Sequence, residues 1–216
     1  MEKRKVLVVE DDSLLRSLIS EVLSGSGFSV SSAANAVEAK NLISTFDPDV
    51  ALLDIELGAG PSGLDLGEFI KSQAPHIALI FLTHLPDPRF AGVDSGSIPK
   101  KSAYIRKELI SKPGILLEIV ESVLRDETGK NMRHDLDPQR PFAGLSKSQI
   151  AVLRSVALGL SNYEIATQRD TSVRAVENLI RRTLSAAGIE GDSTVNTRTA
   201  AARAYIEAAG FPVGNE

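Results

Sequence analysis

Hydrophobic and polar positions follow two alternating patterns along the first 126 residues. Short apolar, β-branched runs predict buried strands, and amphipathic stretches between them predict helices. The predicted strands are 6–9, 29–32, 50–53, 78–82 and 103–105, and the predicted helices are 14–23, 36–43, 64–72 and 115–124. Because apolar strands alternate with helices, we predict an α/β fold: a doubly wound, five-stranded parallel sheet with helices on both faces.

The pattern weakens between the fourth and fifth predicted strands and again after the last helix. Residues 87–102 are rich in Gly and Pro, so we expect the helix there to be short, distorted or partly loop. Residues 127–141 are polar, aperiodic and contain two prolines, which is typical of a linker. We therefore predict a first domain over 1–126 and a second over 142–216, joined by this linker.

From residue 145 onward the pattern is purely helical and predicts a small all-α domain of four helices. A short helix over 162–168 and a turn over 169–172 lead into a helix over 173–187. That helix has an apolar back, made of Val176, Ile180, Thr183, Leu184 and Ala187. Its polar front is made of Arg174, Glu177, Asn178, Arg181 and Ser185. This spacing predicts a helix-turn-helix, and Arg and Asn match the chemistry of base edges and phosphates.

Composition narrows the class of protein. Hydrophobic residues make up 43% and charged residues 24%, as in ordinary globular proteins, and the absence of cysteine excludes disulfides and thiolate metal sites. No apolar run is long enough for a membrane span, so we expect a cytoplasmic protein with no membrane partner. The first 126 residues carry 13 Lys and Arg against 18 Asp and Glu, and the rest 11 against 10. With no overall basic excess, DNA binding depends on the local placement of charge.

Three acidic residues directly follow predicted strands of the sheet. Glu10 and Asp11 follow the first strand, and Asp54 follows the third. Ligands of open parallel sheets bind beyond the carboxyl ends of the strands, where these carboxylates should meet. Clustered carboxylates repel one another unless a cation neutralises them, which predicts a Mg²⁺ site. Asp54 would then be a nucleophile able to accept a phosphoryl group.

A hydroxyl and an ammonium group reach the same predicted edge. Thr83 ends the fourth strand and Lys107 follows the fifth, so both could bind the oxygens of a phosphoryl group on Asp54. Each residue alone has an ordinary interpretation as a turn, cap or surface residue. Their joint occurrence, in order on successive strands, favours a phospho-acceptor site.

Four sequence stretches, VLVVEDDSLLR, ALLDIEL, IFLTHL and AYIRK, together resemble the receiver domain of two-component response regulators over about the first 125 residues. The resemblance implies a flavodoxin-like fold with Asp54 as the phosphorylated residue. It also implies Mg²⁺ held by Glu10, Asp11, Asp54 and the backbone carbonyl of Glu56. Thr83 and Lys107 would bind the phosphoryl group, and Thr83 and Tyr104 would be the switch residues.

The chain departs from the receiver pattern in three places. The loop after Asp54, IELGAGPSG, is one residue longer than usual, and the segment from Thr83 to Tyr104 is long and Gly-rich. Lys100 and Lys101 compete with Lys107 as the conserved lysine. We prefer Lys107 because Tyr-x-x-Lys at the end of an apolar strand keeps the register.

The stretch LSKSQIAVLRSVALGLSNYEIATQRDTSVRAVENLIRRTLSAAGI resembles the LuxR-type helix-turn-helix output domain of response regulators. The resemblance implies that Asn178 and Arg181 face DNA bases, while Arg174 and Arg182 contact the backbone. Relatives often have Lys where this chain has Tyr163 and Glu177, which predicts weaker non-specific binding. The Ala-rich helix over 200–209 could pair two copies into a homodimer.

These features favour a non-enzymatic transcription regulator gated by phosphorylation of Asp54 from a sensor histidine kinase, with double-stranded DNA as the other partner. Two alternatives stay open. One is a pseudo-receiver regulator that works without phosphorylation. The other is a protein-interaction adaptor that acts on the transcription machinery. A phosphatase resembling haloacid dehalogenases, built on Asp54 and Glu56, leaves the acidic pair after the first strand and the helical domain unexplained.

Overall fold

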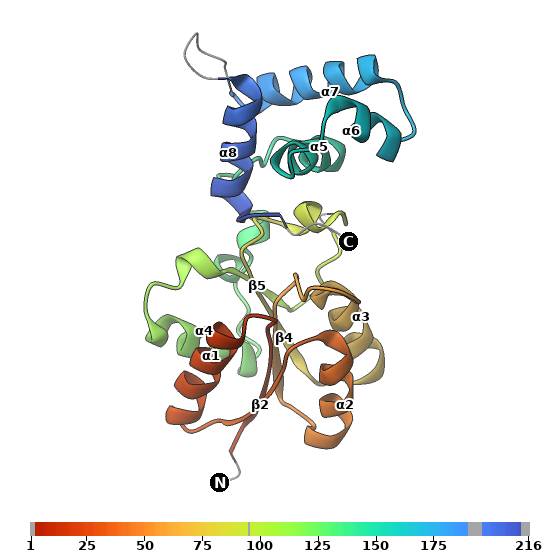
Figure 1. Cartoon of the computed structure of the whole chain (residues 1–216). Helices are drawn as coiled ribbons and strands as arrows, with labels where there is room; N and C mark the ends of the chain where they lie inside the picture. The colour runs from red at the N-terminus through yellow and green to blue at the C-terminus, as the bar shows by residue number, and fades with distance from the viewer. Residues whose placement is uncertain (1–2, 95, 190–195, 213–216) are drawn as a thin grey trace. The chain divides into compact units, whose positions relative to one another are not determined.

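Figure 1 shows a computed structural model of the chain, in which residues 3–94, 96–189 and 196–212 are described. The chain divides into two compact units. The first contains residues 1–84 and 96–136, and the second contains residues 85–95 and 137–216. The chain therefore passes between the units more than once. The predicted boundaries at 126 and 142 describe a single passage and leave residues 85–95 in the first domain.

The first unit is built on a five-stranded, all-parallel sheet in the order β2-β1-β3-β4-β5. The strands are β1 (Lys5–Val9), β2 (Ser29–Ala33), β3 (Val50–Leu53), β4 (Ala78–Thr83) and β5 (Ala103–Arg106). The helices are α1 (Ser13–Gly25), α2 (Ala36–Phe46), α3 (Gly63–Gln73) and α4 (Pro113–Leu124). The predicted doubly wound α/β fold is confirmed, with each predicted strand and helix present within a few residues.

Helices cover both faces of the sheet (Figure 1), which is why the strands are apolar on both sides. Helices α1 and α4 pack on one face, where Val8, Leu52 and Ile80 lie in one core cluster with Leu23 and Val120. Side chains that alternate with these along the strands, including Leu7, Leu53 and Phe81, point to the opposite face, and all three are fully buried. Helices α2 and α3 lie on that side. Burial on both faces fixes the register of the strands and therefore the positions of the residues that follow them.

Between β4 and β5 the described residues form no α-helix, as the Gly- and Pro-rich sequence predicted. In the described part of this segment there is one 3₁₀ helix, η1 (Pro88–Ala91). A second 3₁₀ helix, η2 (Lys107–Leu109), follows β5. Asp87 caps η1 by accepting a hydrogen bond from the Arg89 amide at 2.9 Å, and Gly92 ends it with a φ of 79°. Pro88 and Gly92 thus favour one short turn over a longer helix.

Residues predicted as a linker are partly ordered against the sheet. Two 3₁₀ helices, η3 (Lys130–Met132) and η4 (His134–Leu136), contact β5. The Arg106 amide donates to Nδ1 of His134 at 3.1 Å, and an isolated parallel bridge joins Tyr104 to Arg133. A polar, aperiodic sequence did not predict this because the partners are nearly 30 residues away along the chain.

The second unit contains four α-helices in its described residues: α5 (Lys147–Ala157), α6 (Asn162–Gln168), α7 (Val173–Ala186) and α8 (Thr197–Ala209). Capping boxes begin α5 at Ser146 and α6 at Ser161, where each serine and the Gln or Glu three residues later satisfy each other's backbone amides. Helix α8 packs against α5, and α7 packs against both α5 and α6. The predicted small helical domain is therefore present. No described helix is long and apolar enough to span a bilayer.

Candidate functional site

The parallel register brings the acidic residues together at the carboxyl ends of β1 and β3. Val9 pairs with Leu53, so Glu10 and Asp54 leave the sheet side by side, and the Asp54 amide donates to the Val9 carbonyl at 2.9 Å. Carboxylate oxygens of Glu10, Asp11 and Asp54 lie within 4.8 Å of one another. Glu10 and Asp54 are buried, whereas Asp11 is exposed. The cluster is thus open to solvent on the Asp11 side.

Lys107 closes the buried side of this cluster. Its Nζ lies 2.7 Å from Oε2 of Glu10 and 2.7 Å from Oδ2 of Asp54, and its side chain is 8% exposed. The competing candidates lie elsewhere: Lys101 pairs with Asp126 on the surface at 2.7 Å, and Lys100 is exposed. The structure therefore brings Lys107, as the Tyr-x-x-Lys register suggested, to the acidic site.

The charges at the site do not balance without a further cation. Burial, and then the neighbouring Asp54 carboxylate, raise the pKa of Glu10 from 4.5 to about 7 although Lys107 opposes the shift. Burial lowers the pKa of Lys107, but Asp54 and Glu10 outweigh it and raise that pKa overall. One ammonium thus faces three carboxylates, an excess of negative charge on oxygen ligands that a hard divalent ion would neutralise. The donor set fits Mg²⁺.

Thr83 and Tyr104, the predicted switch pair, both lie in the interior of the first unit. Thr83 ends β4 beside Arg106 of β5 and is fully buried, and Tyr104 in the middle of β5 is also fully buried. The register places Thr83 and Lys107 at the same end of the sheet as Asp54. The five predicted side-chain groups Glu10, Asp11, Asp54, Thr83 and Lys107 therefore follow or end strands at one edge.

A close backbone approach positions the loop after Asp54. A Cβ on Gly63, the first residue of α3, would lie 1.8 Å from the Asp54 carbonyl oxygen, so only glycine fits there. The Gly63 amide donates to the Ile55 carbonyl at 3.0 Å, and the Glu56 amide donates to Oδ1 of Asp54 at 3.3 Å. The longer loop thus returns to Asp54 and holds its carboxylate.

Two contacts at this edge were not predicted from the sequence. The Arg16 guanidinium donates from Nη1 to the backbone carbonyls of Glu10 at 2.5 Å and Asp11 at 3.2 Å, which holds the acidic loop. His84 and Glu108, the residues after Thr83 and Lys107, form a half-exposed pair with Nδ1 2.6 Å from Oε1. That hydrogen bond raises the pKa of His84, while burial opposes the rise. The available signal was that they directly follow Thr83 and Lys107 in the sequence.

Helix α7 of the second unit presents the predicted polar front to solvent. Arg174, Asn178, Arg181 and Arg182 are all exposed, and Val176, Thr183 and Leu184 on the back are buried. Ser172 caps the helix by accepting from the Ala175 amide at 3.2 Å. Arg181 Nη2 donates weakly to Oδ1 of Asn178 at 3.3 Å, so these two side chains lie together on the exposed face. The front can meet an external partner.

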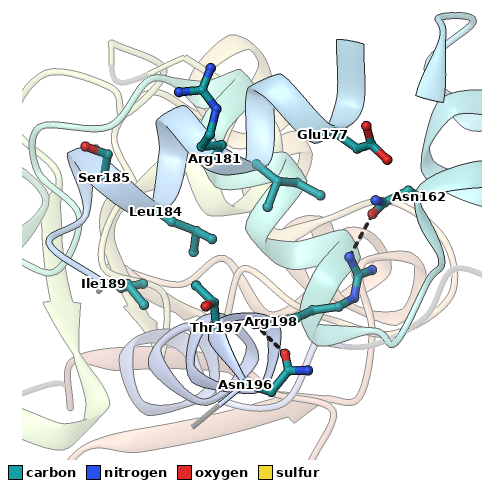
Figure 2. A pocket seen from close by; sticks show the side chains of 10 residues that line it. Asn162, Glu177, Arg181, Leu184, Ser185, Ile189, Asn196, Thr197 and Arg198 are labelled. Carbon is teal, nitrogen blue, oxygen red and sulfur yellow. Dashed lines mark hydrogen bonds between the residues drawn. The ribbon is translucent and has the colours of Figure 1, made fainter. Parts of the chain in front are cut away.

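A hollow of about 880 Å³ separates part of α7 from the start of α8 (Figure 2). Its apolar lining comes from Ile180, Leu184 and Ile189, and Arg181 extends from α7 on the side away from α8. Arg198 of α8 donates to Oδ1 of Asn162 at 2.8 Å and also to the Leu160 carbonyl. Arg198 therefore ties α8 to the turn before α6, a supporting role that the sequence did not reveal.

Comparison with known proteins identifies the class. Residues 6–93 match the family described as the response regulator receiver domain. A receiver domain protein (CheY-like) from Methanospirillum hungatei JF-1 matches 58% of this chain and 97% of its own, with 25% identity and a TM-score of 0.51. The predicted resemblance to response regulators is confirmed, and the matched residues, 6–93, carry a receiver domain.

Two further relatives extend over both units. The oxygen regulatory protein NreC of Staphylococcus aureus (strain MRSA252) is 24% identical over 186 residues, which cover 80% of this chain and 86% of NreC. The two-component response regulator RcsB, solved in complex with DNA, is 19% identical with a TM-score of 0.56 and covers 96% of this chain and 99% of its own. At this identity, the likeness to RcsB shows a shared fold, in the helical unit as well as in the first unit.

Proposed function

We propose that this chain is a DNA-binding response regulator in which phosphorylation of Asp54 gates homodimerisation and transcriptional control. One observation carries the proposal: Lys107 Nζ lies 2.7 Å from both Asp54 and Glu10 at the strand edge where Asp11 adds a third carboxylate. A buried nucleophile, an acidic cation site and an ammonium for the product thus occupy one place. The protein acts as a regulator in the cytoplasm, where DNA and the kinase domain meet, rather than as an enzyme.

The acidic residues prepare Asp54 for phosphoryl transfer. Glu10, Asp11, Asp54 and the backbone carbonyl of Glu56 would hold Mg²⁺, which when bound neutralises charge on the phosphoryl oxygens. An Asp54 carboxylate oxygen forms the new bond to phosphorus, and the phosphohistidine nitrogen of a sensor kinase departs with its bonding electron pair. The buried surroundings of Asp54 limit water near the acceptor.

Lys107 and Thr83 bind the phosphoryl group once it is on Asp54. Lys107 already contacts Oδ2 of Asp54 and needs only to shift its donor to a phosphoryl oxygen. The Thr83 hydroxyl, at the end of β4, donates to another oxygen, and Tyr104 adjusts in the interior as Thr83 moves. The energy available for switching is the difference between the contacts these groups make in the two states.

The exposed front of α7 would read DNA. Arg181 and Asn178 would contact base edges, since Arg forks onto guanine and Asn onto adenine, and Arg174 and Arg182 would contact phosphates. The similarity to RcsB, which was solved in complex with DNA, supports this assignment, and so does the similarity to the oxygen regulatory protein NreC. Because each copy of the chain presents one DNA-reading helix, two copies would read paired half-sites.

Phosphorylation is tested by incubating the full chain with acetyl phosphate and Mg²⁺ and measuring labelling of Asp54 by mass spectrometry. We expect labelling of the wild type, no labelling without Mg²⁺, and none in Asp54→Asn. Lys101→Met is the control and should be labelled like the wild type because Lys101 pairs on the surface. A wild type that takes no label would favour the pseudo-receiver alternative.

DNA binding is tested on duplexes selected from a random pool by the full chain. Arg181→Ala should weaken binding to the selected duplexes by about 1–3 kcal/mol and relax the sequence preference at the contacted base. Arg174→Ala should weaken binding to all duplexes alike and reduce the slope of the salt dependence by about 1. Arg154→Ala, on α5, is a charge-matched control. If the wild type selects no duplex, the protein-interaction adaptor becomes the better hypothesis.

A further inference from the structure

Residues 85–94, called here the inserted segment, leave the sheet directly after β4 but belong to the second unit. By its contacts the segment groups with residues 137–216, whereas the chain on either side of it groups with the sheet. It contains η1, which packs against α5. A piece of the chain between two strands of the receiver is therefore part of the helical unit.

A buried ionic cluster anchors the inserted segment. The Asp87 carboxylate is fully buried and accepts hydrogen bonds from Arg89 Nη2 at 2.5 Å and from Arg140 Nε at 2.7 Å. Burial works against the charged form, but these hydrogen bonds hold the pKa of Asp87 below its usual value. The Arg89 guanidinium also donates to the backbone carbonyls of Phe142 and Leu145. Every charge in the cluster thus has a partner within the second unit.

An aromatic cluster adds an apolar anchor. Phe90 is 4% exposed, and its ring lies 6.3 Å from that of Phe142 and 5.5 Å from that of Tyr205 on α8, between centroids. Such ring pairs add directional packing to the burial of apolar surface. The inserted segment therefore contacts both α5 and α8, and α5 in turn packs against α7.

The inserted segment begins two residues after Thr83. The Cα atoms of Thr83 and Leu85 are separated by two peptide units, a reach of about 7 Å at most. A single residue, His84, lies between Thr83, whose hydroxyl is proposed to bind the phosphoryl group, and the inserted segment. A movement of Thr83 therefore acts on the segment through the chain itself, and the segment's anchorage acts back on Thr83.

We propose that the inserted segment is the element through which phosphorylation of Asp54 acts on the DNA-binding helices, an inference that rests on the proposed function. Thr83 shifts toward the phosphoryl group and draws on the segment, which changes the packing of Asp87 and Phe90 against α5 and α8. Those helices support α7, so its DNA-binding state changes with the state of Asp54. Packed elements of this kind convert small displacements into discrete changes.

The test compares two insertions in the full chain. One variant carries Gly-Gly between His84 and Leu85, and its matched control carries Gly-Gly between Leu136 and Asp137, where the chain passes between the units without adjoining a phosphoryl ligand. For each protein, Asp54 labelling by acetyl phosphate is measured, and so is affinity for a selected duplex before and after labelling.

We expect a phosphorylation response of about tenfold in the wild type and in the control insertion, and of less than about twofold in the His84–Leu85 insertion. A full response in the His84–Leu85 insertion would overturn the proposal. Loss of the response in both insertions would overturn it as well, because lengthening any connection between the units would then be enough to abolish the response. A wild type that is not labelled, or does not respond, would contradict the proposed function instead.

A second pair of variants tests the role of the inserted segment if the His84–Leu85 insertion prevents labelling of Asp54. Arg140→Gln removes one partner of Asp87, and Arg133→Gln removes the partner of Asp135, an equally buried carboxylate paired at 2.7 Å in the first unit. We expect the phosphorylation response to fall severalfold only in Arg140→Gln. Equal responses in the two variants would refute the role of the inserted segment.

Discussion

At the acidic site of the first unit, Glu10, Asp54 and Lys107 are almost wholly buried and only Asp11 is exposed, whereas the charged groups on the front of α7 are all exposed. Glu10 is 3% exposed, Asp54 6% and the Lys107 side chain 8%, while Arg174 and Arg181 face solvent. Charges interact strongly where water is excluded and weakly where it screens them. The acidic site should therefore respond sharply to single substitutions, and α7 should respond gradually through the sum of its contacts.

The largest effect is expected where backbone approaches backbone. Gly63→Ala would place a Cβ 1.8 Å from the Asp54 carbonyl oxygen, so either α3 or the loop after Asp54 must move. We expect a loss of about 3 kcal/mol in the free energy of unfolding, with little labelling of Asp54. Gly114→Ala is the control, because a Cβ there meets nothing within 4 Å, and it should be neutral or slightly stabilising. Urea denaturation compares the two, and equal stability would contradict the close approach.

A loss of stability of about the same size should follow removal of the buried ammonium group of Lys107. Lys107→Met leaves the Glu10 and Asp54 carboxylates without their partner, and we expect about 3 kcal/mol of destabilisation at pH 8. The loss should shrink at pH 5.5, where Glu10 becomes protonated, and with added Mg²⁺. Lys101→Met breaks only an exposed pair and should cost less than about 1 kcal/mol. Denaturation at both pH values checks this; a pH-independent loss would argue against charge as the cause.

Magnesium affinity should depend on pH through Glu10. Its pKa is raised to about 7, so below that value Mg²⁺ must displace a proton, and affinity should rise by up to about tenfold per pH unit from pH 6 toward 7. In the metal-free protein, protonation of Glu10 affects folding stability, and this pH dependence has the opposite sign. The folded state binds the Glu10 proton more tightly than the unfolded state, so its contribution to stability falls as pH rises from 4.5 to about 7. Calorimetric titration with MgCl₂ at pH 6, 7 and 8 measures the first effect, and Glu10→Gln should abolish the dependence.

The smallest effect is expected on α7. Glu177→Lys replaces an exposed acidic residue on the polar front with a basic one, so one more phosphate contact becomes possible. We expect severalfold tighter non-specific duplex binding and a salt slope steeper by about 0.9. Glu207→Lys, on the exposed side of α8, is the control for the same change in net charge. Equal slopes in the two variants would place Glu177 away from the DNA.

Much of the acidic site was predictable because parallel strands obey a simple rule. Residues that follow the strands must gather at one edge, so Glu10, Asp54 and Lys107 could be assigned from their positions after apolar runs. The choice of Lys107 over Lys101 also followed from register. The contacts of Arg16 and Gly63 could not be assigned, because they depend on how closely a helix or loop returns to the strand end.

The domain boundaries show where sequence reasoning ends. Residues 127–141 were predicted as linker from polarity, yet Met132 is buried and His134 accepts from the Arg106 amide. The Gly- and Pro-rich segment after β4 was correctly predicted to lack a regular helix. Nothing local indicated that Asp87 and Phe90 pack with residues more than 50 positions away, since such contacts leave no periodic trace.

The sequence by itself determined the elements, the five-stranded parallel sheet and the carboxylates that gather at its edge. These follow from local periodicity, capping residues and the chemistry of strand ends, which neighbouring residues decide. Only the tertiary structure decided that Lys107 bridges Glu10 and Asp54, that Gly63 abuts the Asp54 backbone, and that the inserted segment joins the helical unit. Those features arise from burial and long-range pairing, where the free energy depends on partners that the local sequence does not contain.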